Sequence, residues 1–273
     1  MNLIGGNVLI TGATGGIGQA TARAFAARGA SLILTGRKAE VLEPLAAEVR
    51  GRALGCDLSK RTDVEKLCGE ALATELDVLV ANAALPASGL LTELSQEEID
   101  RMLEVNLRAP MALAHALVPG MIERGRGHVV FVSSLSGKAA NPASSVYSAT
   151  KFGLRGFALG LREDLRTHHV GVSTVLPGFI SDSGMFADAQ RSLAEGHIKL
   201  PTGVSTRTPQ QVAAAVIKAI ERNRAELDVA PPLVRFGATF AGAAPQLAAA
   251  ASRLMGSSRI AGEVAKGQRD KRA

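Results

Sequence analysis

The sequence of 273 residues is poor in aromatic side chains and in cysteine. It has no tryptophan and one tyrosine, Tyr147, so the core must be built mainly from Ala, Val, Leu and Ile. The two cysteines, Cys56 and Cys68, have neither metal-ligand spacing nor disulfide partners, which predicts free thiols and no metal site. Free thiols persist in reducing compartments, so we expect a cytoplasmic protein.

Long apolar runs are also missing. No stretch of about 18 uninterrupted apolar residues occurs, so no transmembrane helix is expected. The first residues lack a basic region followed by a long apolar run and a cleavage site, which is not typical of a secretion signal.

Positive and negative charges nearly balance until the C-terminal segment, which is basic. The formal net charge is +6, and residues 233–273 carry +5 of it, because seven basic side chains there face only Glu263 and Asp270. The seven are Arg235, Arg253, Arg259, Lys266, Arg269, Lys271 and Arg272. The rest of the chain is close to neutral, so we expect no nucleic-acid partner.

Short apolar runs alternate with longer helical patterns from residue 7 to about residue 230. Predicted strands cover 7–11, 31–35, 53–56, 77–81, 128–133, 171–176 and 226–229. Predicted helices cover 17–28, 39–50, 63–73, 96–124, 148–168 and 209–222. This alternation predicts a single α/β domain over 1–231 with a Rossmann-like, doubly wound parallel sheet of about seven strands. Residues 232–273 form an Ala-rich, basic and helical C-terminal extension.

One segment, 182–208, interrupts the alternation. Its glycines, prolines and scattered apolar residues predict a loop with a short helix that covers a site. Met185 and Phe186 in it are candidates for apolar substrate contacts, although core packing explains them equally well.

A glycine-rich turn follows the first predicted strand and opens the first predicted helix. Glycine lets the backbone approach a pyrophosphate, and a helix N-terminus offers it unpaired N–H groups. The residues are Gly12, Thr14, Gly15, Gly16, Ile17 and Gly18. The strand–turn–helix setting favours a dinucleotide site over a simple tight turn.

The end of the second predicted strand bears on the choice of dinucleotide. NAD sites place an acidic side chain here for the ribose 2′-hydroxyl, but this chain has none before Glu40. Arg37 is suited to a 2′-phosphate because its guanidinium makes paired charge-assisted hydrogen bonds. The sequence therefore predicts a preference for NADP(H) over NAD(H).

Ser134 follows a predicted strand, and Tyr147 and Lys151 lie four residues apart on a predicted helix. That spacing places the two side chains on one helix face. A nearby ammonium is expected to lower the pKa of Tyr147, so that it can exchange a proton with a substrate oxygen while hydride moves at carbon. Ser134 would hold the same oxygen by a hydrogen bond.

These motifs together resemble the short-chain dehydrogenase/reductase family, in its single-domain alcohol/ketone branch. The resemblance covers residues 5–230 and adds further positions in the family's order and spacing. They are Asp57-Leu58, Asn82-Ala83, Asn106 and Pro177-Gly178. Two departures stand out: Ala81-Asn82-Ala83-Ala84 replaces the family's Asn-Asn-Ala-Gly, and Asp182 stands where a threonine is common.

The resemblance implies roles for individual residues. Asn106 would hold a water in a proton relay with Lys151 and Tyr147, and Lys151 would also bind the nicotinamide ribose. The remaining cofactor contacts would come from Asp57 and Leu58 at the adenine, Asn82 and Ala83 at the cofactor-side backbone, and Pro177, Gly178 and Ile180 at the nicotinamide.

The expected function is an oxidoreductase that moves a hydride between NADP(H) and an apolar alcohol or ketone. Leu85 and Leu135, with the two side chains of segment 182–208, suggest the apolar substrate. A 3-oxoacyl-thioester reductase of the same family and a non-catalytic NADP(H)-binding or sensing protein are the alternatives. A homo-oligomer is expected from the resemblance, and the C-terminal extension allows peripheral membrane contact.

Overall fold

The computed structural model describes residues 3–85, 89–181, 206–247 and 250. Seven parallel strands form one sheet in the order β3-β2-β1-β4-β5-β6-β7. Their bounds are β1 Asn7–Thr11, β2 Ser31–Gly36, β3 Arg52–Gly55, β4 Val78–Ala81, β5 Gly127–Val132, β6 Val170–Pro177 and β7 Glu226–Val229. The predicted Rossmann-like fold class is confirmed, and each predicted strand is present to within one residue at either end.

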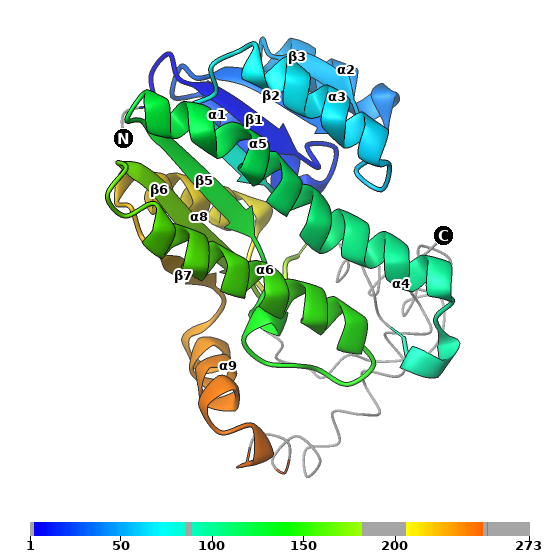
Figure 1. The fold of residues 1–273 in the computed structure, drawn as a ribbon. Helices are drawn as coiled ribbons and strands as arrows, with labels where there is room; N and C mark the ends of the chain where they lie inside the picture. The colour runs from blue at the N-terminus through cyan, green and yellow to red at the C-terminus, as the bar shows by residue number, and fades with distance from the viewer. Residues whose placement is uncertain (1–2, 86–88, 182–205, 248–249, 251–273) are drawn as a thin grey trace.

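Helices cover both faces of the sheet, as a doubly wound fold requires (Figure 1). One face is covered by α3 (Arg61–Leu72), α5 (Ala109–Glu123) and α6 (Ser145–Asp164). The other is covered by α1 (Gly16–Ala26), α2 (Ala39–Glu48) and α8 (Pro209–Glu221). Because the inner strands β1, β4 and β5 are buried on both faces, they read as largely continuous apolar runs rather than as alternating ones.

The order of the strands determines where a ligand can bind. The chain leaves β1 toward β2 and β3 on one side and later returns to β4 on the other. Neighbouring loops therefore part at the carboxyl ends of β1 and β4, which is the crevice where open α/β sheets hold their ligands. The glycine-rich turn lies at this point.

The predicted helix over 96–124 is not one regular helix. It consists of α4 (Gln96–Leu103), a π-helical turn (Glu104–Arg108) and α5. Pro110 has no N–H to donate to the preceding turn, which accounts for a local change in the hydrogen-bond ladder. Asn106 lies within the π-helical turn, and its side chain is 1% exposed.

The start of the C-terminal extension is helical and packed. Helix α9 (Pro232–Ala243, orange in Figure 1) follows β7 and contacts a short 3₁₀ turn, η3 (Leu135–Gly137). Ala238 of α9 is buried with Leu135 and Leu176 in a small apolar cluster. The extension therefore begins against the turn that follows Ser134. Its residues beyond 250 lie outside the described part of the chain.

Candidate active site at the carboxyl edge of the sheet

The glycine-rich turn is packed so closely that side chains are excluded from it. Gly12 has a φ of +65°, which favours glycine, and a Cβ there would lie 2.7 Å from Cα of Ala83. A Cβ on Gly18 would collide with the carbonyl oxygen of Gly12. A Cβ on Gly36, at the end of β2, would lie 2.7 Å from Cγ2 of Thr14. These close contacts hold the backbone of the turn against the residues that follow β1, β2 and β4.

Helix α1 starts directly behind this turn. Its N-cap, Gly15, offers no side chain to the N–H groups of the first turn. Those N–H groups and the positive end of the helix dipole suit a pyrophosphate. This part of the site therefore fits the phosphates of a dinucleotide.

Arg37 and Asp57 lie beyond the ends of two paired strands. Gly36 of β2 is paired with Gly55 of β3, so the residues that follow both strands lie at the same edge. Burial opposes the charge of Asp57, but hydrogen bonds from Ser59 and the positive charge of Arg37 hold the pKa of Asp57 below its usual value. Arg37 is exposed, and its guanidinium is open to a phosphate group at this edge. Leu58 is buried beside them.

Asn82 ties the end of β4 to the glycine-rich turn. Its Nδ2 donates to the carbonyl oxygens of Thr11 at 3.0 Å and of Gly12 at 3.1 Å. The backbone N–H groups of Asn82 and Ala83 both donate to Oγ1 of Thr11, at 3.1 Å each. The two strand ends that form the crevice are thus held together by polar groups.

Tyr147 and Lys151 lie side by side on α6 and are both buried. Nζ of Lys151 lies 5.6 Å from the centroid of the Tyr147 ring and donates to the carbonyl oxygen of Val132 at 3.2 Å. Ser134 follows β5, and a hydrogen bond joins its side chain to Tyr147. Three of the four predicted catalytic residues are therefore together at the carboxyl edge of the sheet.

The pKa of Tyr147 differs in direction from the sequence-based expectation. Burial raises it to about 12, and the hydrogen bond with Ser134 only partly opposes this. Burial also lowers the pKa of Lys151 to about 8. The prediction that Lys151 brings the phenol pKa below its ordinary value is wrong for this structure, because removal of both groups from water has the larger effect.

Asn106 forms hydrogen bonds with Leu85, after β4, and with Thr150, which lies between Tyr147 and Lys151 on α6. Its Oδ1 accepts from the backbone N–H of Leu85 at 2.7 Å, and its Nδ2 donates to the carbonyl oxygen of Leu85 at 3.0 Å. Nδ2 also reaches Oγ1 of Thr150 at 3.4 Å, on the helix that carries Tyr147 and Lys151. The π-helical turn thus connects the chain after β4 to α6.

The segment after β6 closes the same edge. Gly178 donates its N–H to the carbonyl oxygen of Val229, and a Cβ on Gly178 would lie 3.0 Å from Cβ of Ala230 and 3.2 Å from Cδ1 of Leu135. Pro177 and Ile180 are buried, and Ile180 forms a bridge with Arg207. The predicted loop over 182–208, with Asp182, Met185 and Phe186, lies outside the described residues except for its last three, 206–208.

Comparisons with known proteins match this arrangement. The short chain dehydrogenase family model matches residues 6–194. The bovine protein "Dehydrogenase/reductase SDR family member 7B" (Bos taurus) is 34% identical over 83% of this chain and 74% of its own length. "Ketoacyl reductase HetN" of Nostoc sp. is 34% identical over 83% of this chain and 79% of its own. A crystal structure of a metagenomic short-chain oxidoreductase in complex with NADP is 31% identical, covers 85% of this chain and 99% of its own, and has a TM-score of 0.69.

The chain belongs to the short-chain dehydrogenase family. It is an oxidoreductase of that family on a Rossmann-like fold. Within the described residues, no helix is long and apolar enough to cross a membrane.

Sequence reasoning overlooked several residues that organise the site of this short-chain dehydrogenase. Thr11 accepts hydrogen bonds from two backbone N–H groups, and Thr150 accepts one from the side chain of Asn106. The missing side chain of Gly36 leaves space for Thr14. Thr11 ends an apolar strand directly before the glycines, which was a usable signal. Thr150 gave none, because its partner lies 44 residues away in the chain.

Proposed function

We propose that this protein transfers a hydride between NADP(H) and an apolar alcohol or ketone. The observation that carries the proposal is the buried group of Ser134, Tyr147 and Lys151 at the same sheet edge as the glycine-rich turn. A proton donor and a dinucleotide cradle at one crevice are the two requirements of carbonyl reduction.

The cofactor would be held by the residues whose close packing excludes side chains. Gly12 and Gly18, together with the first turn of α1 that begins at Gly16, would hold the pyrophosphate, with Thr14, Gly15 and Ile17 around it. Arg37 would bind the 2′-phosphate, Asp57 and Leu58 the adenine, and Asn82 with Ala83 the neighbouring backbone. Lys151 would bind the nicotinamide ribose, and Pro177, Gly178 and Ile180 would line the nicotinamide. When bound, NADPH supplies the hydride.

The proton would come from Tyr147. With its pKa raised to about 12, the phenol is protonated at neutral pH and is ready to donate to a carbonyl oxygen. Ser134 would hold that oxygen. Lys151, whose pKa of about 8 leaves it mostly protonated at neutral pH, would stabilise the phenolate after the transfer. Asn106 would support the relay from the π-helical turn.

The substrate would contact apolar side chains. Leu85 packs against Tyr147, and Leu135 directly follows Ser134. A 3-oxoacyl thioester is the alternative substrate, favoured by the 34% identity with a ketoacyl reductase. A sensor that holds NADP(H) without turnover is less consistent with the buried group, because binding alone has no need of a proton donor, Tyr147, beside Ser134.

A titration of the purified protein with NADPH and NADH, followed by cofactor fluorescence, tests the cofactor preference. Binding of NADPH should exceed that of NADH, and Arg37→Ala should weaken only NADPH binding, by about tenfold to a hundredfold. Lys218→Ala, an exposed cation on α8, is a matched control. Equal binding of both cofactors, unaffected by Arg37→Ala, would overturn the NADP(H) preference. A panel of free ketones and 3-oxoacyl thioesters then separates the two substrate classes.

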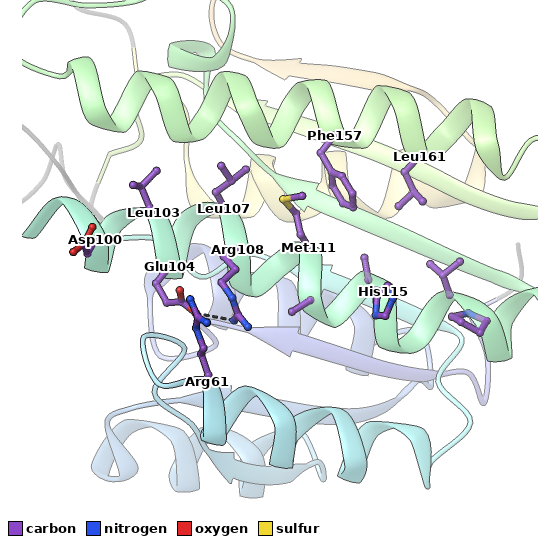
Figure 2. Close-up of a pocket in the computed structure, with 14 residues that line it drawn as sticks. Arg61, Asp100, Leu103, Glu104, Leu107, Arg108, Met111, His115, Phe157 and Leu161 are labelled. Atoms are coloured by element: carbon purple, nitrogen blue, oxygen red, sulfur yellow. Dashed lines mark hydrogen bonds and ion pairs between the residues drawn. The ribbon is translucent and has the colours of Figure 1, made fainter. Parts of the chain in front are cut away.

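We also propose that two copies of the chain associate through a groove beside α5. Figure 2 shows Leu103 of α4, Leu107 of the π-helical turn and Met111 of α5 on the side that faces α6, which contributes Phe157 and Leu161. The rim carries both signs of charge, with Arg108 and Arg61 near Glu104, so a twofold-related copy could pair cations with carboxylates. Met111→Glu should convert a dimer or tetramer to monomer in sedimentation velocity. A monomeric wild-type protein would contradict the proposal.

The extension supports a third proposal, peripheral contact with an anionic membrane. Leu233, Phe236 and Phe240 of α9 are 81%, 70% and 43% exposed, and their spacing places them on one face of the helix. The basic residues after 250 would add attraction to anionic lipid. Co-sedimentation with anionic vesicles should fall in a Phe236→Ser/Phe240→Ser variant. Equal partitioning of wild type and variant would remove this idea.

A further inference from the structure

Four charged side chains form a cluster that links β7 to α6 and to the residue after η3. Nζ of Lys138 contacts Oδ1 of Asp228 at 2.7 Å and Oε2 of Glu226 at 3.2 Å. Glu226 also accepts from Arg155, from Nε at 2.5 Å and from the NH2 group at 3.2 Å. Two cations and two carboxylates balance one another here, and three of the four side chains are 20% exposed or less.

The members of the cluster come from three separate elements. Glu226 and Asp228 lie two residues apart on β7, so both point to the same face of the sheet. Lys138 directly follows the turn η3, which begins after Ser134. Arg155 lies on α6, one helical turn beyond Lys151. Glu226 is the residue that binds both cations.

The turn η3 and α6 touch directly between these two anchors. Oγ of Ser133 donates to the carbonyl oxygen of Lys151 at 3.0 Å. A Cβ on Gly137 would lie 2.7 Å from that same carbonyl oxygen, so the turn lies against the helix at Lys151. Glu226 forms ion pairs with Lys138 on one side of this contact and with Arg155 on the other. The ion pairs therefore act across the contact between the serine turn and the tyrosine helix.

We propose that Glu226 is a positioning residue: by binding Lys138 and Arg155 together, it holds η3 against α6 and keeps Ser134 beside Tyr147. The inference goes beyond the proposed function and rests on it for the meaning of the Ser134–Tyr147 pair. Charge supports it, because Arg155 and Lys138 outweigh burial and keep the pKa of Glu226 below its usual value, so the carboxylate stays ionised. Neutralising Glu226 would leave both cations half-buried without their shared partner.

Because the sequence has a single tyrosine, a tyrosine signal reports on the Ser134–Tyr147 geometry directly. Tyr147 is the one tyrosine in the sequence, so a protein labelled with ¹³Cζ-tyrosine gives a single assigned resonance. The chemical shift of that carbon responds to the hydrogen bond with Ser134 and needs no catalytic turnover. Ser134→Ala shows how the resonance moves when the hydrogen bond is lost.

The test compares Glu226→Gln with a matched control, Asp77→Asn. Asp77 is also a largely buried carboxylate paired with an arginine, Arg126 at 2.8 Å, but it directly precedes β4, at the amino end of that strand. Glu226→Gln should move the Tyr147 resonance in the same direction as Ser134→Ala, and Asp77→Asn should leave it unchanged. Lys138→Met removes both ion pairs between the end of η3 and β7 and should move the resonance in the same direction, which covers the case in which Glu226→Gln does not fold.

Kinetics give the second readout. Glu226→Gln should lower kcat by about tenfold or more with little change in the KM for NADPH, because a displaced serine affects the transition state rather than cofactor binding. A wild-type resonance in Glu226→Gln and Lys138→Met, or an equal shift in Asp77→Asn, would overturn the inference. So would a resonance that Ser134→Ala leaves in place. If the resonances behave as expected but the wild-type protein turns over no ketone, the proposed function fails and the positioning role stands.

Discussion

Lys151 is expected to destabilise the fold at neutral pH, so its replacement by methionine should give a more stable protein. Burial lowers the pKa of Lys151 from its ordinary 10.5 to about 8. At 1.36 kcal/mol per pKa unit, holding the charged form in this place costs about 3 kcal/mol. Methionine removes the charge but also the hydrogen bond to the carbonyl oxygen of Val132, worth about 1 kcal/mol. The net gain is about 2 kcal/mol, or roughly 5 °C in Tm.

The dependence of this gain on pH follows from the direction of the pKa shift. A lysine whose pKa is depressed in the folded state contributes its full stability above the unfolded pKa and loses it as pH falls through the folded pKa. The gain in stability of Lys151→Met over wild type should therefore be largest below about pH 8 and should fall as pH rises toward 10.5, where the lost hydrogen bond leaves the variant slightly less stable.

Denaturant unfolding of both proteins between neutral pH and pH 10.5 measures it. Lys218→Met, at an exposed position of α8, is the control and should change stability little at any pH. A Lys151→Met protein less stable than wild type throughout that range would show that the buried charge of Lys151 does not destabilise the fold. Loss of turnover together with gain of stability is the pattern expected of a residue kept for chemistry.

Two further predictions concern the phenol and the glycine-rich turn. Because Tyr147 is the one tyrosine, the near-ultraviolet absorbance of tyrosinate reports on it alone; half-ionisation is expected near pH 12, and a midpoint at or below pH 10 would contradict the effect of burial. Gly18→Ala should reduce NADPH binding at least tenfold, because its Cβ would meet the carbonyl oxygen of Gly12 and push the turn out of place. The matched variant Gly69→Ala, on α3 with open space around it, should bind NADPH like the wild type, and equal binding by both variants would argue against the cradle.

The strands were predictable because each carries its own signal. The run 7–11 is largely apolar and lies between glycines, and 226–229 alternates acidic and apolar residues before two prolines; the structure has both with these bounds. The spacing of Tyr147 and Lys151 likewise requires only one helix to bring the side chains together. Features set within one element or one turn are local, and the sequence contains enough information to predict them.

Features that depend on packing between distant segments were not predictable. The π-helical turn around Asn106 continues an unbroken helical pattern, with Pro110 as the only local sign of a change. The raised pKa of Tyr147 depends on how completely α6 is covered, which no motif states. The partners Lys138 and Glu226 are 88 positions apart, and each alone reads as an ordinary surface charge.

The most direct test of the account is NADPH consumption with a panel of apolar ketones, for wild type and Tyr147→Phe side by side. Wild type should oxidise NADPH when a ketone is present. Tyr147→Phe should bind NADPH with unchanged affinity and lose turnover by about a hundredfold or more, because the proton donor is gone and the ring remains. Equal turnover by the two proteins would contradict the role of Tyr147, and no turnover by wild type with any ketone or 3-oxoacyl thioester would contradict the proposed reaction.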